Sequence, residues 1–379
     1  MDEPTIIVII DALGFDLVSK HGFHPHGLER KVRLETVLGF SQAALTSIFT
    51  GLRPDQHGLW AMYSFESERS PFRWLRYLPG GISSRRLCLR RLIRWKLERV
   101  HGVSSYYSLY SIPREILMHL DLPARANLFD RGGVEGCKTI LDVLEEQGAS
   151  VFVRDYRTSE ERAFDELEEA VKGGRNDFYI LYTAGLDSQL HECGTGDGRI
   201  LSKLNWYGER IDRLLVADTR ARMFVFGDHG FSDVTDQIDL ISQVESLSLR
   251  VPGDYIPFYD STMARFKIMS GRAGEALKGL LQDCHKGRIL EEEELEDLGL
   301  SFGDNRYGDI IFLLDPGKII VPSFMSNEPV AGMHGYHPDS DDMYSVMFTN
   351  ASIDNKDRSI CDVADIVLPG FKASGRRKA

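Results

Sequence analysis

Short apolar runs alternate with helical patterns along most of the 379-residue chain. Four runs are typical of buried strands, because each is short, rich in β-branched and aromatic residues, and bounded by polar or glycine-containing turns. They span residues 5–10, 150–154, 177–183 and 222–227. Helical patterns occupy residues 42–49, 134–147, 160–172 and 203–218. This alternation predicts an α/β fold with a mostly parallel central sheet and helices on both faces.

Two regions interrupt the alternation. Residues 60–131 read as an inserted helical segment, and residues 244–330 contain two strand-like runs, "TMARFKIM" and "DIIFLLD", around an acidic helix near "LEEEELEDL". We therefore expect one domain over residues 1–379 that carries a basic, aromatic insertion and a smaller cap-like subdomain or sheet extension.

The insertion is basic although the whole chain has a net charge of -12. Residues 69–99 contain one acid, Glu98, and interleave tryptophan, leucine and phenylalanine with ten basic residues. These are Arg69, Arg73, Arg76, Arg85, Arg86, Arg90, Arg91, Arg94, Lys96 and Arg99. Three interpretations stay open: a solvated helix whose arginine stems cover apolar surface, an amphipathic segment on an anionic membrane, or a lid that gathers a polyanionic substrate.

The net charge, the apolar runs and the cysteines of the chain bear on its binding partners and its cellular location. A net charge of -12 argues against general nucleic-acid binding. The N-terminal apolar run, residues 6–10, predicts a strand and not a signal peptide, and no run approaches the roughly 20 apolar residues of a membrane span. Five cysteines without C-x-x-C spacing fit a reducing compartment. We therefore expect a cytoplasmic protein, peripheral to the membrane if residues 69–99 bind it.

Carboxylates and imidazoles follow apolar strands or lie in glycine turns at four separate places. They are Asp11, Asp187 with His191, Asp228 with His229, and His334. Taken singly, an aspartate after a strand is often a helix N-cap and a histidine in a turn is often structural. Asp187 and His191 are four residues apart, which places them on one face of a helical turn. Together the three aspartates and three histidines suffice for two zinc-type sites.

Ser41 is a candidate nucleophile. It follows a Gly-Phe turn and precedes "QAALTSIF", a helical pattern, so it is expected at a helix N-terminus. Backbone N–H groups there favour an anion. The alternative interpretation is that Ser41 only caps the helix.

The ordered motifs "TGLRPDQHG", "DSQLHECG", "GDHGFSD" and "GMHGY" resemble the alkaline phosphatase superfamily, and most closely its type I phosphodiesterase/nucleotide pyrophosphatase family. The resemblance extends from residue 6 to about residue 337, with 60–131 and 244–330 largely outside it. It implies an alkaline phosphatase-like fold and two divalent metal ions of the zinc type, with manganese as the alternative.

Carried over by position, the resemblance implies a ligand set for each metal. Asp187, His191 and His334 would hold one ion, and the other would be held by Asp11, Asp228, His229 and the Ser41 oxygen. The glycines beside Asp228 and His229 are expected to let the backbone turn sharply. Ser41 would attack phosphorus, and water would hydrolyse the resulting phosphoryl-enzyme intermediate.

Two positions depart from the family pattern. Ser41 stands where the family usually has threonine, and Ala44 stands where it usually has a phosphate-binding asparagine. Loss of one such oxyanion donor can cost roughly 10²-fold in rate. Gln42, the Ser41 backbone N–H or an arginine of the insertion are the candidate substitutes.

We therefore expect a metal-dependent hydrolase of phosphodiester or pyrophosphate bonds. Its substrate would be a small phosphorylated molecule such as a nucleotide, a nucleotide-sugar, or a lipid or glycan phosphodiester. The alternatives are a phosphomonoesterase, a phosphonate hydrolase or a phospho-group transferase with the same site. A different class is a membrane-surface or partner-binding protein whose metal site is only structural.

Overall fold

The computed structural model describes residues 3–79, 87–354 and 356–375. Arg85 and Arg86 of the basic segment lie outside the described residues. The chain forms two compact units, which are treated separately below. The first comprises Met1–Arg53, Phe129–Asp233 and Val330–Ala379, and the second comprises Pro54–Leu128 and Val234–Pro329.

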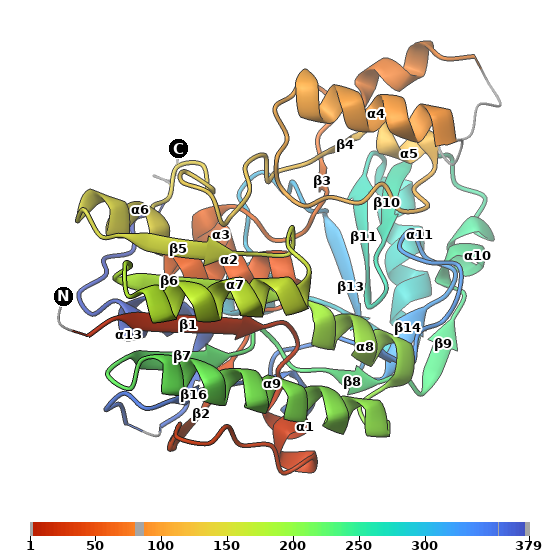
Figure 1. Cartoon of the computed structure of the whole chain (residues 1–379). Coiled ribbons are helices and arrows are strands. Elements are labelled where there is room, and N and C mark those ends of the chain that lie inside the picture. The colour runs from red at the N-terminus through yellow and green to blue at the C-terminus, as the bar shows by residue number, and fades with distance from the viewer. Residues whose placement is uncertain (1–2, 80–86, 355, 376–379) are drawn as a thin grey trace. The chain divides into compact units, whose positions relative to one another are not determined.

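The first unit is built on a seven-stranded sheet of order β17-β2-β16-β7-β1-β6-β5 (Figure 1). Its strands are β1 Thr5–Ile10, β2 Arg30–Glu35, β5 Val151–Arg154, β6 Phe178–Thr183, β7 Arg222–Phe226, β16 Ser345–Thr349 and β17 Arg358–Ser359. The four strands predicted from the sequence, β1, β5, β6 and β7, are mutually parallel neighbours. Only β16 runs antiparallel to its neighbours β7 and β2. The mostly parallel central sheet is therefore confirmed.

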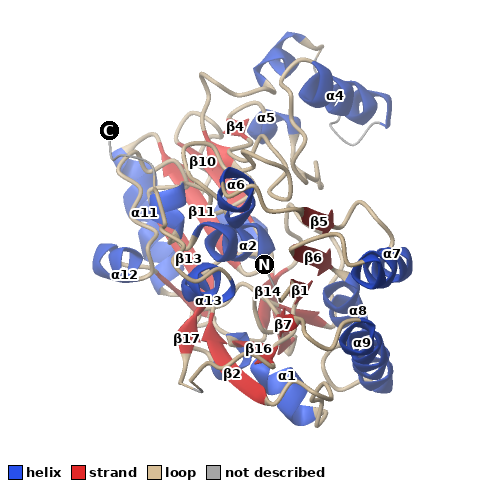
Figure 2. Cartoon of the chain, turned by 60° about the vertical axis from the view of Figure 1, so that its left-hand side comes forward, coloured by secondary structure: helices blue, strands red, loops and turns tan. Residues whose placement is uncertain are grey.

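Helices cover both faces of this sheet (Figure 2). One face carries α1 Phe15–Lys20, α7 Glu160–Gly173, α8 Gly185–Cys193 and α9 Gly198–Ala217; the other carries α2 Ser41–Thr50, α6 Ile140–Glu146 and α13 Val363–Val367. All six residues of β1 are buried, as expected for a parallel strand covered on both sides. Helix α6 is shorter than predicted because Thr139 and Asp142 form a capping box that starts it at Ile140.

The register of the parallel strands places three polar turns at one edge of the sheet. Ile10 of β1 pairs with Thr183 of β6, and Ile9 pairs with Phe226 of β7. The residues that follow β1, β6 and β7 therefore emerge side by side at the carboxyl edge, where α/β sheets bind ligands. A short antiparallel pair, β8 Ser232–Asp233 with β15 Gly332–Met333, adds a fourth turn there.

The second unit contains a four-stranded antiparallel sheet of order β10-β11-β13-β12. These strands are β10 Tyr255–Tyr259, β11 Met263–Ile268, β12 Gly287–Ile289 and β13 Ile310–Leu314. The helices are α3 Pro54–His57, α4 Leu87–Arg99, α5 Arg114–Leu117, α10 Leu240–Glu245, α11 Gly271–Gln282 and α12 Glu292–Asp297, with a 3₁₀ turn at Arg73–Tyr77. Two short pairs, β3 Ser64–Phe65 with β4 Leu120–Asp121 and β9 Asp236–Ile238 with β14 Lys318–Ile320, complete it.

The regions expected as an insertion and as a subdomain share one hydrophobic core in this second unit. Phe72 and Leu97 come from residues 60–131, whereas Phe258 and Phe312 come from residues 244–330, and all four are buried in the same cluster. The role of residues 60–131 as a lid or as a surface contact stays a prediction.

Two further properties follow from the described residues. No helix among them is both long and apolar enough to cross a membrane. All five cysteines are free thiols, of which Cys137 is buried and Cys88, on α4, is exposed.

Candidate metal centre

Asp11 is the centre of one group of polar side chains at the carboxyl edge of the first unit's sheet. Its Oδ1 lies 3.2 Å from His229 Nε2 and accepts a 3.4 Å hydrogen bond from Ser41 Oγ. Ser41 Oγ is also 3.1 Å from His229 Nε2. Asp228 joins through its Oδ2, which is 3.5 Å from the same histidine nitrogen. The structure thus brings together all four residues expected to form the second metal site.

Asp187 is the centre of the adjoining group. Its Oδ1 lies 3.4 Å from His191 Nε2, one helical turn further along α8, and 3.6 Å from His334 Nε2. The structure therefore also brings together the three residues expected to form the first metal site.

The two groups are joined by His229 and His334, whose rings stack 3.8 Å apart and almost parallel, at 8°. Among the described residues, two sets of donor atoms lie close enough to hold a metal ion: Asp11, Asp228 and His229, and Asp187, His229 and His334. His229 belongs to both sets and His191 to neither, although His191 lies beside Asp187. The structure therefore does not divide these residues into two separate ligand sets as expected, because His229 belongs to both donor sets and His191 to neither.

Backbone carbonyls orient two of the histidine rings. Nδ1 of His191 donates to the Gly332 carbonyl at 2.9 Å, and Nδ1 of His229 donates to the Gly230 carbonyl at 3.0 Å. In each ring the proton is thereby assigned to Nδ1, and Nε2 is directed at the carboxylates. His334 is held because β15, which precedes it, pairs with β8, two residues beyond Gly230.

The glycines beside Asp228 and His229 lie against backbone from other parts of the chain. Neither Gly227 nor Gly230 adopts a positive φ. A Cβ on Gly227 would come within 2.5 Å of the Leu13 carbonyl oxygen, and one on Gly230 would collide with the Asp342 carbonyl oxygen. The chain bends at Asp228, as expected, without a positive φ at either glycine. These two glycines also allow neighbouring backbone to approach closely.

Tyr182 contacts the site but was not singled out by the sequence analysis. Its phenol donates a short hydrogen bond to Asp11 Oδ2, and burial together with the Asp11 carboxylate raises the pKa of Tyr182 well above its usual value, so it remains a donor. The ring stacks on Phe129, with ring centres 5.3 Å apart. Within β6, "FYILYT", this tyrosine is indistinguishable from a core residue; its place one residue before the end of the strand was the available signal.

Ser41 is the first residue of α2 and not its cap. The N-cap is Phe40, which makes no side-chain capping hydrogen bond. The capping alternative for Ser41 is thereby removed, and the hydroxyl points instead at Asp11 and His229. The uncapped first turn leaves N–H groups beside the hydroxyl, as an anion site requires.

Gln42 and Ala44 follow Ser41 in the first turn of α2. Ala44 is buried and has only a methyl group to offer. The side-chain oxygen of Gln42 is buried without a hydrogen-bond partner among the described residues. An amide side chain carries both hydrogen-bond donors and an acceptor, so Gln42 could form further hydrogen bonds beside Ser41.

The electrostatics of the cluster reflect an excess of buried acids. Burial and the neighbouring Asp11 carboxylate raise the pKa of Asp228 to about 8. Burial alone would lower the pKa of His229, but Asp228 and Asp11 outweigh it and raise the value to about 10. For His334, burial and the charges of His229 and His191 hold the pKa well below its usual range. Protons thus supply the positive charge that a bound cation would supply instead.

The residues present fit divalent cations. Oδ1 of Asp187 and Oδ2 of Asp228 are buried without hydrogen-bond partners within the described part of the chain. Buried polar atoms without partners are costly, and a coordinated ion would satisfy them. Imidazole nitrogens and carboxylate oxygens in this number suit zinc-type ions.

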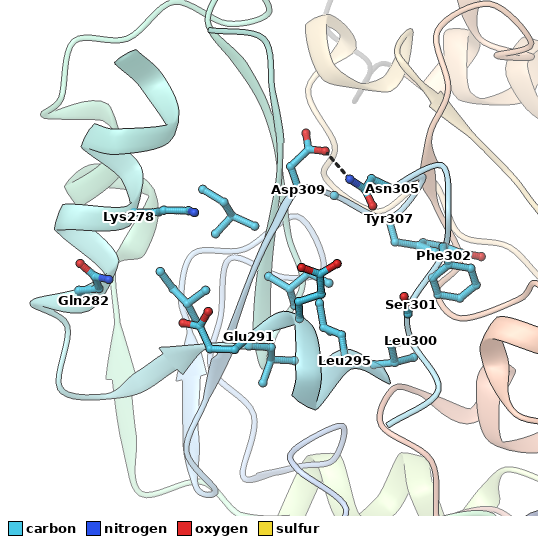
Figure 3. A pocket seen from close by; sticks show the side chains of 16 residues that line it. Lys278, Gln282, Glu291, Leu295, Leu300, Ser301, Phe302, Asn305, Tyr307 and Asp309 are labelled. Carbon is cyan, nitrogen blue, oxygen red and sulfur yellow. Dashed lines mark hydrogen bonds between the residues drawn. The ribbon is translucent and has the colours of Figure 1, made fainter. Parts of the chain in front are cut away.

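The second unit contains a separate cavity of about 400 Å³ (Figure 3). Lys278 and Gln282 of α11 line one side, and Leu295 and Phe302 line the other. Its Asp309 is already engaged by Asn305 at 3.2 Å and by Lys267 at 3.1 Å. Neither metal-type set found among the described residues includes an acid of this cavity; both sets lie in the first unit.

Comparison with known proteins agrees with this site. The family model for type I phosphodiesterase / nucleotide pyrophosphatase matches residues 119–337, more than half of the chain. The chain belongs to the type I phosphodiesterase/nucleotide pyrophosphatase family. This confirms the resemblance to the alkaline phosphatase superfamily, and it makes the chain a member of a family of hydrolytic, bimetal-dependent enzymes. The matched residues include Asp187, His191, Asp228, His229 and His334; Asp11 and Ser41 precede them and reach the same site through β1 and α2.

Solved structures share the fold of this family member. Murine ectonucleotide pyrophosphatase / phosphodiesterase 5 matches with a TM-score of 0.67 at 14% identity, over 100% of this chain and 98% of that chain. The human protein of the same name matches with a TM-score of 0.68 at 14% identity, over 100% and 97%. An inactive variant of the murine protein, solved in complex with AMP, matches with a TM-score of 0.67 at the same identity, over 100% and 97%. No curated protein sequence matches the chain.

Proposed function

We propose that the protein hydrolyses phosphodiester or pyrophosphate bonds of nucleotide-type substrates, with Ser41 as the nucleophile. The observation that carries this proposal is the position of the Ser41 hydroxyl. It lies at the uncapped start of α2, 3.1 Å from His229 and 3.4 Å from Asp11, inside a cluster of metal-type donors. A serine that only caps a helix has no reason to contact two such groups.

Two divalent ions of the zinc type, with manganese as the alternative, are proposed as cofactors. Asp11, Asp228 and His229 would hold one beside Ser41, and Asp187, His334 and the adjacent His191 would hold the other. When bound, such ions act as Lewis acids toward the phosphoryl oxygens and lower the pKa of coordinated hydroxyl groups.

The side chains of the site then have defined tasks. Ser41 Oγ gives up its proton and forms the bond to phosphorus while the bond to the leaving oxygen breaks, and the leaving oxygen takes up a proton. Water afterwards cleaves the resulting serine phosphodiester, which releases the phosphomonoester and regenerates the hydroxyl. The free N–H groups of the first turn of α2 are placed to hold non-bridging oxygens. Tyr182 fixes Asp11 through its hydrogen bond to Oδ2, which leaves Oδ1 directed at Ser41 and His229.

The nucleotide class rests on two supports. The family is one of nucleotide pyrophosphatases and phosphodiesterases, and a structural relative of the same fold binds AMP. The second candidate function is a phosphomonoesterase or phospho-group transferase with the same nucleophile. It is retained because Ala44 stands where the family usually has a donor to the phosphoryl oxygens.

The test is a comparison of the parent protein with Ser41→Ala and Ser41→Thr on bis-p-nitrophenyl phosphate, the p-nitrophenyl ester of thymidine monophosphate, and p-nitrophenyl phosphate. We expect Ser41→Ala to lose roughly 10³-fold or more of the diester activity while its metal content stays unchanged. Ser41→Thr keeps a hydroxyl and should retain activity. Diester hydrolysis by Ser41→Ala at the parent rate would overturn the proposal, and faster cleavage of the monoester would favour the second candidate.

A further inference from the structure

Helix α4, Leu87–Arg99, has two apolar faces, only one of which is used by the protein. Leu89, Ile93 and Leu97 recur every four residues and are buried in the core of the second unit. On the opposite side, Trp95 is 55% exposed and Leu92 is 45% exposed. The buried face is sufficient to hold the helix in place, so the exposed face is not needed for folding.

The exposed face combines apolar and cationic side chains. Cys88, Arg91, Leu92, Trp95 and Arg99 recur at spacings of three and four residues and are all exposed. Arg91 and Arg99 form no ion pair within the described part of the chain. Glu98, the one acid of the helix, is not among these five residues, and it accepts a hydrogen bond from the Tyr107 hydroxyl at 3.3 Å. The outward stripe is therefore positively charged, on a chain of net charge -12.

Other basic residues of the helix have partners inside the second unit. Arg90 donates to the Tyr110 carbonyl at 2.6 Å, and the Lys96 ammonium lies 4.6 Å from the centre of the Trp74 ring. These two side chains attach α4 to the rest of the second unit. The contrast with Arg91 and Arg99 separates cations that stabilise the helix from cations that remain available to a partner.

We propose that the outward stripe of α4 binds the surface of an anionic lipid membrane, with the helix axis parallel to the membrane plane. Trp95 and Leu92 would enter the boundary between head groups and acyl chains, where tryptophan is favoured, and Arg91 and Arg99 would contact lipid phosphates. This inference goes beyond the proposed hydrolase function and does not rest on it.

The composition of the stripe distinguishes a membrane from a soluble polyanion. A soluble polyanion needs cations alone, and it gives no reason to expose a tryptophan and a leucine between two arginines. A lipid surface needs both, because charge attracts the helix and apolar side chains then anchor it. Two basic residues and two apolar anchors predict weak, reversible and salt-sensitive binding.

Vesicle sedimentation tests this directly. The full chain is mixed with phosphatidylcholine vesicles that contain about one-third phosphatidylserine, and with vesicles of phosphatidylcholine alone. We expect binding to the anionic vesicles only, a loss of binding at high salt, and a blue shift of tryptophan emission. The shift would report Trp95, because the other tryptophans, Trp60, Trp74 and Trp206, are buried or half-buried.

Variants assign the binding to the stripe. Arg91→Gln with Arg99→Gln should weaken binding about 25-fold, since each basic residue near the surface contributes about fivefold. Trp95→Ser with Leu92→Ser should weaken it by about tenfold or more and abolish the emission shift. The matched controls are Met269→Ser, a 57% exposed apolar residue of the same unit, and Arg272→Gln, an exposed base on α11; both should bind as the parent does.

The proposal is overturned if the parent does not sediment with anionic vesicles, or if the serine variant binds as the parent does. It is equally overturned if soluble polyglutamate binds α4 as tightly as the vesicles do and the serine variant is unaffected, because the helix would then be a polyanion site. Thermal unfolding checks that each variant is folded.

Discussion

The metal-type cluster of the first unit buries charged side chains, whereas helix α4 of the second unit exposes large apolar ones. Both differ from the usual distribution of side chains between core and surface. Asp11 and Asp228 are 3% and 0% exposed, although carboxylates normally face water. Trp95 and Leu92 are large and apolar but face outward. Folding alone stabilises neither arrangement. We propose a partner for each: divalent cations for the buried acids, and an anionic lipid surface for the outward stripe of α4, which combines apolar and cationic side chains.

Removal of one buried acid should have the largest effect and should be confined to the first region. Asp228→Asn replaces a carboxylate that lies 3.5 Å from His229 Nε2. We expect loss of metal and a fall of roughly 10³-fold or more in diester hydrolysis, because both the charge and a ligand disappear. Metal analysis and kinetics measure this, and vesicle binding should stay at the parent level. Parent-like metal content would contradict the assignment of Asp228.

Tyr182→Phe should have an intermediate effect. The phenylalanine keeps the stacking on Phe129 but removes the hydrogen bond to Asp11 Oδ2. Loss of a hydrogen bond to a metal ligand typically costs 10- to 100-fold in affinity. Competition with a zinc-binding dye checks this against Phe129→Leu, which alters the stacking and keeps the hydrogen bond. Unchanged affinity in Tyr182→Phe would show that the tyrosine only packs.

Gln42→Ala should lower the diester rate by about tenfold if the amide contacts the phosphoryl oxygens in place of the side chain missing at Ala44. The metal content should not change, since zinc-type ions are held by imidazole, thiolate and carboxylate groups and not by a neutral amide. The diester rates of Gln42→Ala, of Ala44→Asn and of the double variant show whether an asparagine at position 44 replaces the contribution of Gln42. A glutamine variant that is unaffected while Ala44→Asn gains rate would place the donor elsewhere.

Proton release on metal binding is a smaller effect and tests the electrostatics. In metal-stripped protein at pH 7, Asp228 and His229 are protonated, because their pKa values are raised to about 8 and about 10. A metal must displace these protons, so the apparent affinity should rise as the pH rises and level off above about 10. Calorimetric titration with zinc in buffers of different ionisation enthalpy measures the number released. No release at pH 7 would contradict the raised pKa values.

Substitution of the outward stripe of α4 should have the smallest effect, namely on the stability of the protein. Trp95→Ser should change the free energy of unfolding by less than about 0.5 kcal/mol, because an exposed side chain contributes little to folding. Denaturant unfolding measures this. The buried counterpart Ile93→Ser should cost several times more, and similar losses in the two variants would mean that the outward face is packed.

Local patterns predicted β1, β5, β6 and β7 but not β2, β16 and β17, which form the other side of the sheet. β1, β5, β6 and β7 are short apolar runs beside helices, which a local pattern reveals. β2, "RKVRLE", is mostly polar in sequence, and its pairing with β16 joins residues more than 300 positions apart. Such pairing depends on tertiary contacts that a local pattern does not contain.

For the site, the order of motifs selected six carboxylate and imidazole residues and Ser41, and the structure brings their side chains together. Their roles as metal ligands and nucleophile stay predictions. The function of the glycines could not be predicted, because the close approach at Gly230 involves Asp342, far away in the sequence. The sharing of His229 between the two donor sets depends on its stacking with His334, which is also a tertiary contact. The metal identity, the cytoplasmic location and the physiological substrate stay predictions.

Metal analysis of the purified protein tests the central claim most directly. The protein is dialysed against metal-free buffer, and its zinc and manganese contents are measured beside those of Ser41→Ala and Asp228→Asn. The account predicts two divalent ions per chain in the parent and in Ser41→Ala, and fewer in Asp228→Asn. A parent protein that holds no divalent ion, takes none up when zinc or manganese is added, and still hydrolyses the diester would contradict it.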